Sequence, residues 1–128
     1  MKKLAFLVIV ALVCIMVQGC ENDEKIYVAK VYGTVFDKVT GQPLPNIMVK
    51  LVKGYSEYGD VCSSSVTGDD GTYEITVKKV AAYNYVEKTV IDNAWLVVEK
   101  DRYSKYVESL RDIYDGDEIK VDILLEPW

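Results

Sequence analysis

The sequence predicts an all-β domain, an antiparallel sandwich of about seven strands that follows a signal helix removed by cleavage. Three features lead to this fold class. Several runs alternate apolar and polar residues, which is the pattern of strands with one buried face. Turn-forming residues separate these runs at short intervals. Strands with a single apolar face need a second sheet to cover that face, so the runs predict two packed sheets.

Residues 1–19 have the organisation of a signal peptide. Lys2 and Lys3 give a positive start, and residues 4–17 form an unbroken apolar run. A helix of that length rises about 21 Å, short of the roughly 30 Å hydrocarbon core of a bilayer, so a cleaved signal is favoured over a permanent span. The rest of the chain is therefore expected to be exported.

The junction Gly19-Cys20 resembles the lipobox of bacterial lipoproteins, in which the cysteine is acylated and becomes the new N-terminus. This resemblance implies that Cys20 is the lipid-attachment residue and that membrane lipid is a partner of the chain, because several acyl chains together anchor a protein durably. Val17 and Gln18 depart from the usual lipobox residues. Cleavage by the general secretory peptidase is therefore the alternative.

An acidic stretch follows this cysteine, and residues 20–27 are expected to form a tether. Residues 21–24 read ENDE, which resembles the surface-export signal of certain bacterial lipoproteins. The alternative is a solvated linker without a signal role. The resemblance implies a lipoprotein of the cell envelope that is held in the outer membrane and exposed at the cell surface.

The composition of the chain excludes several function classes. Without Lys2 and Lys3 the basic count falls from 15 to 13 against 20 acidic residues, a net charge of −7, and such a balance repels nucleic acid. The sequence has no histidine, so nucleophilic catalysis by a Cys/His or Ser/His pair is excluded. Its acidic runs lack the spacing of a calcium loop. We therefore predict no enzymatic activity, no metal, no cofactor and no nucleic-acid partner.

Cys62 remains after Cys14 leaves with the signal and Cys20 carries lipid. A single remaining cysteine cannot form an internal disulfide, even in an oxidising compartment. Because Cys62 stands in the strand-like run VCSSSVT, we predict a small, partly buried strand residue.

The alternating runs define the strands and their buried faces. The predicted strands cover residues 31–37, 47–53, 62–67, 72–78, 94–99 and 118–126. In four of them the expected inward-facing residues are Val31, Gly33, Val35, Ile47, Val49, Leu51, Tyr73, Ile75, Val77, Ile119, Val121, Ile123 and Leu125. In the run 94–99, Leu96 and Val98 are expected on one side and Trp95 and Val97 on the other.

Residues 103–113 carry two competing patterns. An apolar spacing of i, i+3, i+4 and i+7, from Tyr103 to Leu110, is typical of a helix. The neighbouring strands and the turn-forming sequence Asp115-Gly116-Asp117 favour an extended chain instead. The extended conformation is the prediction, with the helix as its alternative.

Turn chemistry separates the predicted strands. Pro43 and Pro45 stiffen the connection between residues 37 and 47, because proline fixes φ and withholds a backbone donor. This connection is expected to be ordered without a ligand. The sequence Gly68-Asp69-Asp70-Gly71 predicts a tight hairpin that joins the strands 62–67 and 72–78.

The order of these motifs resembles the carboxypeptidase regulatory-like domain. The motifs are Gly33-x-Val35-x-Asp37, Thr40-Gly41-x-Pro43-Leu44, Asp70-Gly71-x-Tyr73 and Val121-x-Ile123-x-Leu125-x-Pro127. The resemblance implies a transthyretin-like, or prealbumin-like, Greek-key sandwich of about seven antiparallel strands over residues 28–128. Residues 79–93 are an insertion relative to short members of the family.

Tyrosine is the unusual residue of this chain, with 10 in all. Tyr55, Tyr58, Tyr83 and Tyr85 stand as spaced pairs in predicted loops and are the candidate partner-binding residues. Tyrosine combines a large contact area with a hydroxyl group, which suits protein interfaces and sugar-stacking platforms. The alternative is that these rings cover the edges of a small sandwich.

The predicted function is that of a non-enzymatic, lipid-anchored interaction or scaffold module of the bacterial cell envelope. Its expected partner, besides membrane lipid, is a protein or a glycan. The alternative is a carbohydrate- or peptide-binding accessory lipoprotein of a nutrient-uptake system. Loop tyrosines that meet at a concave site would favour this alternative.

Overall fold

The computed structural model describes residues 24–82 and 88–128. The strands in these ranges are β1 (Glu24–Asp37), β2 (Met48–Lys53), β3 (Asp60–Val66), β4 (Thr72–Ala82), β5 (Thr89–Val98), β6 (Tyr106–Tyr114), β7 (Glu118–Lys120) and β8 (Ile123–Leu125). Within the described ranges no helix is long and apolar enough to cross a membrane. The predictions for the signal peptide, Cys20, Tyr83 and Tyr85 fall outside these ranges. β1 begins at Glu24, inside the stretch expected to form the tether.

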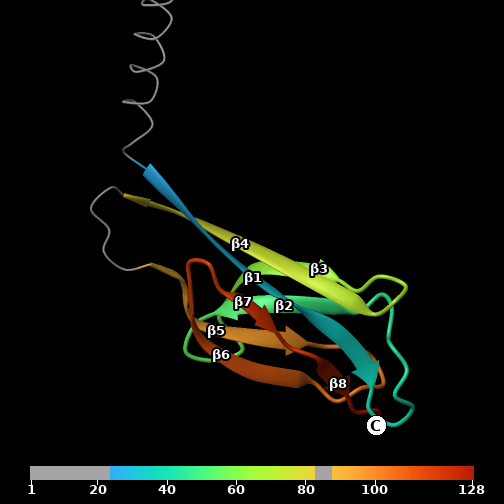
Figure 1. Cartoon of the computed structure of the whole chain (residues 1–128). Helices are drawn as coiled ribbons and strands as arrows, with labels where there is room; N and C mark the ends of the chain where they lie inside the picture. The colour runs from blue at the N-terminus through green and yellow to red at the C-terminus, as the bar shows by residue number, and fades with distance from the viewer. Residues whose placement is uncertain (1–23, 83–87) are drawn as a thin grey trace, which may run out of the picture.

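The strands form two four-stranded sheets, which confirms the predicted all-β sandwich (Figure 1). The first sheet has the order β4-β1-β7, with β8 also paired to β1, and the second has the order β3-β2-β5-β6. β1 is long enough for β7 and β8 to pair with successive parts of it. The two sheets therefore cover each other's apolar faces.

The prediction of an entirely antiparallel sandwich was wrong for β7 and β8, which run parallel to β1. The turn at residues 115–117 carries the chain from β6 in the second sheet to β7 in the first. The chain enters the first sheet beside β1 after this turn, and both β7 and β8 run in the same direction as β1.

The single strand predicted over residues 118–126 is divided into β7 and β8, so residues 24–82 and 88–128 hold eight strands in place of about seven. The division lies at Val121, whose N–H donates to the Tyr32 carbonyl at 2.8 Å. The Val121 carbonyl accepts the Tyr73 hydroxyl at 2.6 Å, and Asp122 Oδ1 accepts the Thr34 N–H at 3.1 Å. These bonds turn the chain locally before it pairs with β1 again.

The predicted inward faces of the four long alternating runs are confirmed. Ile119 and Val121 pack partly buried against the core, and the other inward residues of these runs are buried. The faces of β5 differ from the prediction, because Val97 on the expected outer side is also buried, at 4 % exposure. Trp95 on that outer side is half-buried, and its indole Nε1 donates to the Gly54 carbonyl at 3.0 Å. The loop after β2 thus contacts the outer face of the second sheet.

Residues 106–114 are extended and form β6, which confirms the favoured pattern over the helical one. β6 pairs with β5 antiparallel from Val98 opposite Tyr106 to Thr89 opposite Tyr114. Pairing with β5 satisfies part of the backbone groups that a helix would have satisfied internally. The apolar spacing that resembles a helix instead places Tyr106 and Leu110 partly buried against the core.

The prediction of a hairpin at residues 68–71 was wrong, although the turn itself is tight. The Gly71 N–H donates to the Gly68 carbonyl at 2.9 Å, and Asp70 Oδ1 accepts the Thr72 N–H at 3.1 Å. The strands on either side join different sheets, since β3 pairs with β2 and β4 pairs with β1. The turn crosses from one sheet to the other because each strand finds its backbone partner elsewhere.

The proline-bearing connection is organised around Asp37, a buried residue at the end of β1. Its Oδ1 accepts the N–H groups of Val39 at 2.8 Å and Thr40 at 3.0 Å, and its Oδ2 accepts the Tyr103 hydroxyl at 2.9 Å. These hydrogen bonds hold the pKa of the Asp37 carboxyl below its ordinary value, and the bond from the Thr40 N–H has the largest effect. The carboxylate therefore orders the connection with bonds from the chain itself.

Candidate functional site

Tyr55 and Tyr58 both lie in the loop between β2 and β3, and both side chains are exposed. The exposed fraction is 98 % for Tyr55 and 80 % for Tyr58. Large aromatic rings this open to solvent bury little surface in the fold. Tyr55 and Tyr58 therefore stand as candidates for contacts with another molecule.

The base of this loop is held closely by backbone contacts. The Trp95 indole fixes the Gly54 carbonyl, and the Gly59 N–H donates to the Ser56 carbonyl at 3.2 Å. A Cβ at Gly54 would lie 3.0 Å from the Cα of Gly59, so the two ends of the loop approach each other as only glycines allow. The two ends of the loop that carries Tyr55 and Tyr58 therefore lie in close contact.

Tyr55 borders a cavity of about 370 Å³. The residues that line it are Lys53, Gly54, Tyr55, Asp92, Asn93 and Asp112. The lining combines an aromatic ring, two carboxylates, an amide and an ammonium group. Such a set offers a stacking face together with hydrogen-bond donors and acceptors, which is the chemistry that a polyhydroxyl ligand requires.

The polar wall of this cavity comes from an irregularity in the pairing of β5 with β6. The register shifts between Ile91 and Ala94, and Asn93 has a φ of 50°. The Asn93 N–H donates to Asp112 Oδ1 at 3.0 Å, and the Gly54 N–H donates to the Asn93 carbonyl at 3.2 Å. The bulge thus joins the loop, β5 and β6 at one point and leaves Asp92, Asn93 and Asp112 exposed.

Tyr58 does not line this cavity, because it is engaged elsewhere. The Lys105 ammonium lies 4.3 Å from the centre of the Tyr58 ring, and the same ammonium forms an ion pair with Glu99 at 3.3 Å. A cation held over the ring stabilises its position. The structure therefore separates the two candidate tyrosines, and only Tyr55 belongs to the cavity.

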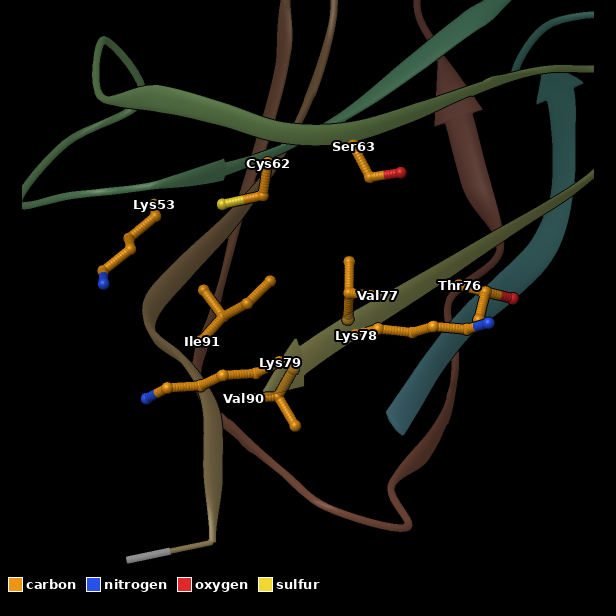
Figure 2. A pocket seen from close by; sticks show the side chains of 9 residues that line it. All are labelled: Lys53, Cys62, Ser63, Thr76, Val77, Lys78, Lys79, Val90 and Ile91. Atoms are coloured by element: carbon orange, nitrogen blue, oxygen red, sulfur yellow. The ribbon is translucent and has the colours of Figure 1, made fainter. Parts of the chain in front are cut away.

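Cys62 lies on β3, as predicted, but the prediction of partial burial was wrong, because its side chain is exposed. It borders a second hollow of about 360 Å³ between β3 and β4, on the open side of the sandwich (Figure 2). Partial loss of water around the thiol raises the pKa of Cys62, so the thiol is protonated at neutral pH. β3 is an edge strand of its sheet, which explains why residues on it remain open to solvent.

The fold is similar to part of several 1,2-dioxygenases of solved structure. Hydroxyquinol 1,2-dioxygenase from Pseudomonas putida matches with a TM-score of 0.53 and 12% identity over 80% of this chain and 57% of its own. Catechol 1,2-dioxygenase from Acinetobacter radioresistens matches with a TM-score of 0.55 and 11% identity over 81% and 53%. Catechol 1,2-dioxygenase from an Acinetobacter species matches with a TM-score of 0.51 and 15% identity over 79% and 53%.

This chain spans little more than half of the length of each of these dioxygenases. No family model matches the sequence, and no curated protein matches it. At such low identities the likeness shows the fold alone. The domain is a β-sandwich of the kind that these enzymes also contain.

The prediction that the chain has no enzymatic activity is contradicted by these neighbours, which are dioxygenases. That prediction rested on the absence of histidine, which excludes histidine-dependent nucleophilic catalysis. It does not exclude other chemistry on a sandwich that is shared with enzymes. The exclusion of an enzyme is therefore withdrawn.

Proposed function

We propose that the chain is a lipid-anchored interaction module of the bacterial cell envelope, attached to the outer membrane through an acylated Cys20 and exposed at the surface. The sequence Gly19-Cys20 after the apolar run supports the anchor. β1 begins at Glu24, four positions after this cysteine. The sandwich would therefore stand close to the lipid that holds it.

The observation that carries the interaction role is the exposure of Tyr55, at 98 % of its surface, beside a polar cavity. A tyrosine ring that is exposed to solvent does not contribute the stabilising apolar contact that a buried ring would contribute. The loop that carries it is closed at its base, where a Cβ at Gly54 would lie 3.0 Å from the Cα of Gly59. An exposed tyrosine ring offers another molecule a large contact area together with a hydroxyl group.

We expect Cys20→Ala to move the protein out of the membrane fraction, because the variant lacks the thiol to which lipid is attached. The measurement is fractionation of cells that produce the full chain, followed by detection of the protein in membrane and soluble fractions. Cys62→Ala serves as the matched control and should stay with the membrane. Unchanged membrane retention of Cys20→Ala, with a normally cleaved N-terminus, would contradict the anchor.

A second candidate function is supported by the lining of the Tyr55 cavity: a carbohydrate-binding accessory lipoprotein of a nutrient-uptake system. The Tyr55 ring supplies a stacking face, and Asp92, Asn93 and Asp112 supply hydrogen-bonding groups for hydroxyls. The cavity is concave, which favours a small ligand or a chain end over a flat protein surface.

We expect Tyr55→Ala to weaken oligosaccharide binding by roughly two- to tenfold, because loss of a stacked ring removes about 0.5 to 1.5 kcal/mol. The measurement is calorimetric titration of the full chain with a panel of soluble oligosaccharides. Tyr58→Ala is the control, since Tyr58 lies outside the cavity. Equal weakening by both variants, or binding that neither variant affects, would count against the Tyr55 cavity as the sugar site.

We also propose that the sandwich is the transthyretin-like fold of carboxypeptidase regulatory-like domains. The motif residues that suggest this family meet one another in space. The Val35 N–H donates to the Gly71 carbonyl at 2.9 Å, and the Leu44 N–H donates to the Val35 carbonyl at 2.8 Å. A Cβ at Gly71 would lie 2.7 Å from the Pro43 side chain. The motif therefore describes one packed corner of the domain, which supports a shared architecture.

A further inference from the structure

The outer face of the first sheet carries exposed apolar side chains at one end. Ile26 is 63 % exposed, Val80 61 % and Val28 37 %. Ile26 and Val80 are directly opposite each other in the pairing of β1 with β4. Val28 lies two positions after Ile26 and therefore on the same face of the sheet. The three side chains form one surface, the β1–β4 patch.

The patch is a local change in the character of this outer face. The outward residues of β4 from Thr72 to Lys78 are polar and exposed, as is usual for a sheet face in water. The face becomes apolar only at Val80, opposite the start of β1. The core does not require this change, because the alternate residues of both strands supply it. The apolar side chains are therefore available for a contact outside the domain.

The patch lies close to the proposed lipid anchor. β1 begins at Glu24, four positions after Cys20. An extended chain spans at most about 3.6 Å per residue, so the start of β1 lies within roughly 14 Å of the Cys20 Cα, and Ile26 within roughly 22 Å. Figure 1 shows the start of β1 beside the end of β4 at one end of the sandwich. Lipid on Cys20 would hold this end of the domain at the bilayer surface.

Two exposed lysines flank the patch. Lys25 precedes Ile26, and Lys78 is the partner of Val28 across the β1–β4 pair. At a membrane surface a lysine lays its apolar stem along the lipid and keeps its ammonium among the headgroups. The carboxylate of Asp115 adjoins the patch, where its Oδ1 accepts the Val28 N–H at 2.9 Å. Because a strand's N–H groups point along the plane of the sheet, this carboxylate lies at the edge of the sheet and not on its outer face.

We propose that the β1–β4 patch lies against the lipid bilayer, so that the anchored domain contacts the membrane directly. This inference rests on the proposed function, because three aliphatic side chains are too small a surface to bind a membrane without an anchor. The anchor at Cys20 provides the high effective concentration of lipid that such a surface needs. With the first sheet on the membrane, the second sheet and its Tyr55 cavity face away from the lipid.

Fluorescence quenching of a label on the patch tests this contact. The full chain with Cys62→Ser and either Ile26→Cys or Val80→Cys is produced in cells and purified in its acylated form. The introduced thiol is then the one that reacts, because the signal peptide has been removed and Cys20 carries lipid. It is labelled with bimane. The protein is placed in phosphatidylcholine vesicles, with or without phosphatidylcholine that carries a nitroxide near its headgroup, and flotation of the vesicles measures anchoring.

We expect nitroxide lipid to cause a loss of fluorescence from the labels at residues 26 and 80, because lipid covers both positions. Aqueous iodide should quench these labels little. Glu74→Cys with Cys62→Ser is the matched control, since Glu74 is an exposed outward residue of β4. It lies six positions before Val80, about 20 Å along the strand. A label there should be quenched by iodide and little affected by nitroxide lipid.

Three results would overturn the inference. Anchored protein whose labels at residues 26 and 80 respond like the label at residue 74 would show a domain that stands away from the membrane, while the anchor itself would stand. Labels at residues 26 and 80 that are shielded from iodide but unaffected by nitroxide lipid would show that another protein or a second copy covers the patch. Protein that does not float with the vesicles would overturn the anchor and the inference together.

Discussion

Leu51→Ala is expected to lower the free energy of unfolding by about 2 to 5 kcal/mol, the range for deletion of a fully buried aliphatic side chain. Leu51 lies in β2, the strand of the second sheet that pairs with both β3 and β5, and its exposure is 0 %. The cavity left behind would be surrounded by core residues of both sheets, which limits its collapse. Urea unfolding of the full chain, followed by far-ultraviolet circular dichroism, measures the change.

Lys50→Ala is the matched control, because Lys50 is the neighbour of Leu51 on the opposite face of the same strand. Its effect should stay within about 0.5 kcal/mol, as is usual for surface substitutions. A similar loss of stability in both variants would mean that β2 does not present one face to the core. That result would contradict the packing of the two sheets described above.

Gly33→Ala is expected to destabilise the domain by about 2 to 4 kcal/mol, through overpacking and the loss of a hydrogen bond. A Cβ at Gly33 would overlap the Val121 carbonyl oxygen and lie 2.7 Å from its carbonyl carbon. The same oxygen accepts the Tyr73 hydroxyl. To make room, the segment between β7 and β8 would have to move away from β1, and the bond from Tyr73 would break.

Gly68→Ala is the control for this substitution. A Cβ at Gly68 would meet only Asp70 Oδ1, at the ordinary contact distance of 3.4 Å, and Gly68 is not among the glycines with positive φ. Its melting temperature should therefore match that of the unchanged protein. If Gly33→Ala also has the melting temperature of the unchanged protein, β1 does not approach Val121 as closely as the structure indicates.

The sequence was sufficient to predict which face of most strands is buried, because period-two alternation depends on each strand alone. It did not predict which strands pair. An Asp-Gly sequence such as the one before β4 suits both a hairpin turn and a turn that crosses between sheets, because both require the chain to reverse. The residues of the turn therefore do not show which of the two it forms. Likewise, nothing local in residues 118–126 shows that the chain returns to β1 in parallel.

The candidate site was predictable only in part. Tyr55 stands in a recognisable loop, so its exposure could be expected. Asp92, Asn93 and Asp112 were missed, because they reach the cavity through a bulge in the pairing of β5 with β6. The one local signal was Asn93, a residue that tolerates positive φ, inside a run with strand character.

The mass of the mature N-terminus tests the proposed function most directly. The protein is extracted from the membrane fraction with detergent, digested, and its N-terminal peptide is analysed by mass spectrometry. The account predicts a peptide that begins at Cys20 and carries the added mass of acyl chains on that residue. A peptide that begins elsewhere, or at Cys20 without added lipid, would contradict the lipid-anchored module.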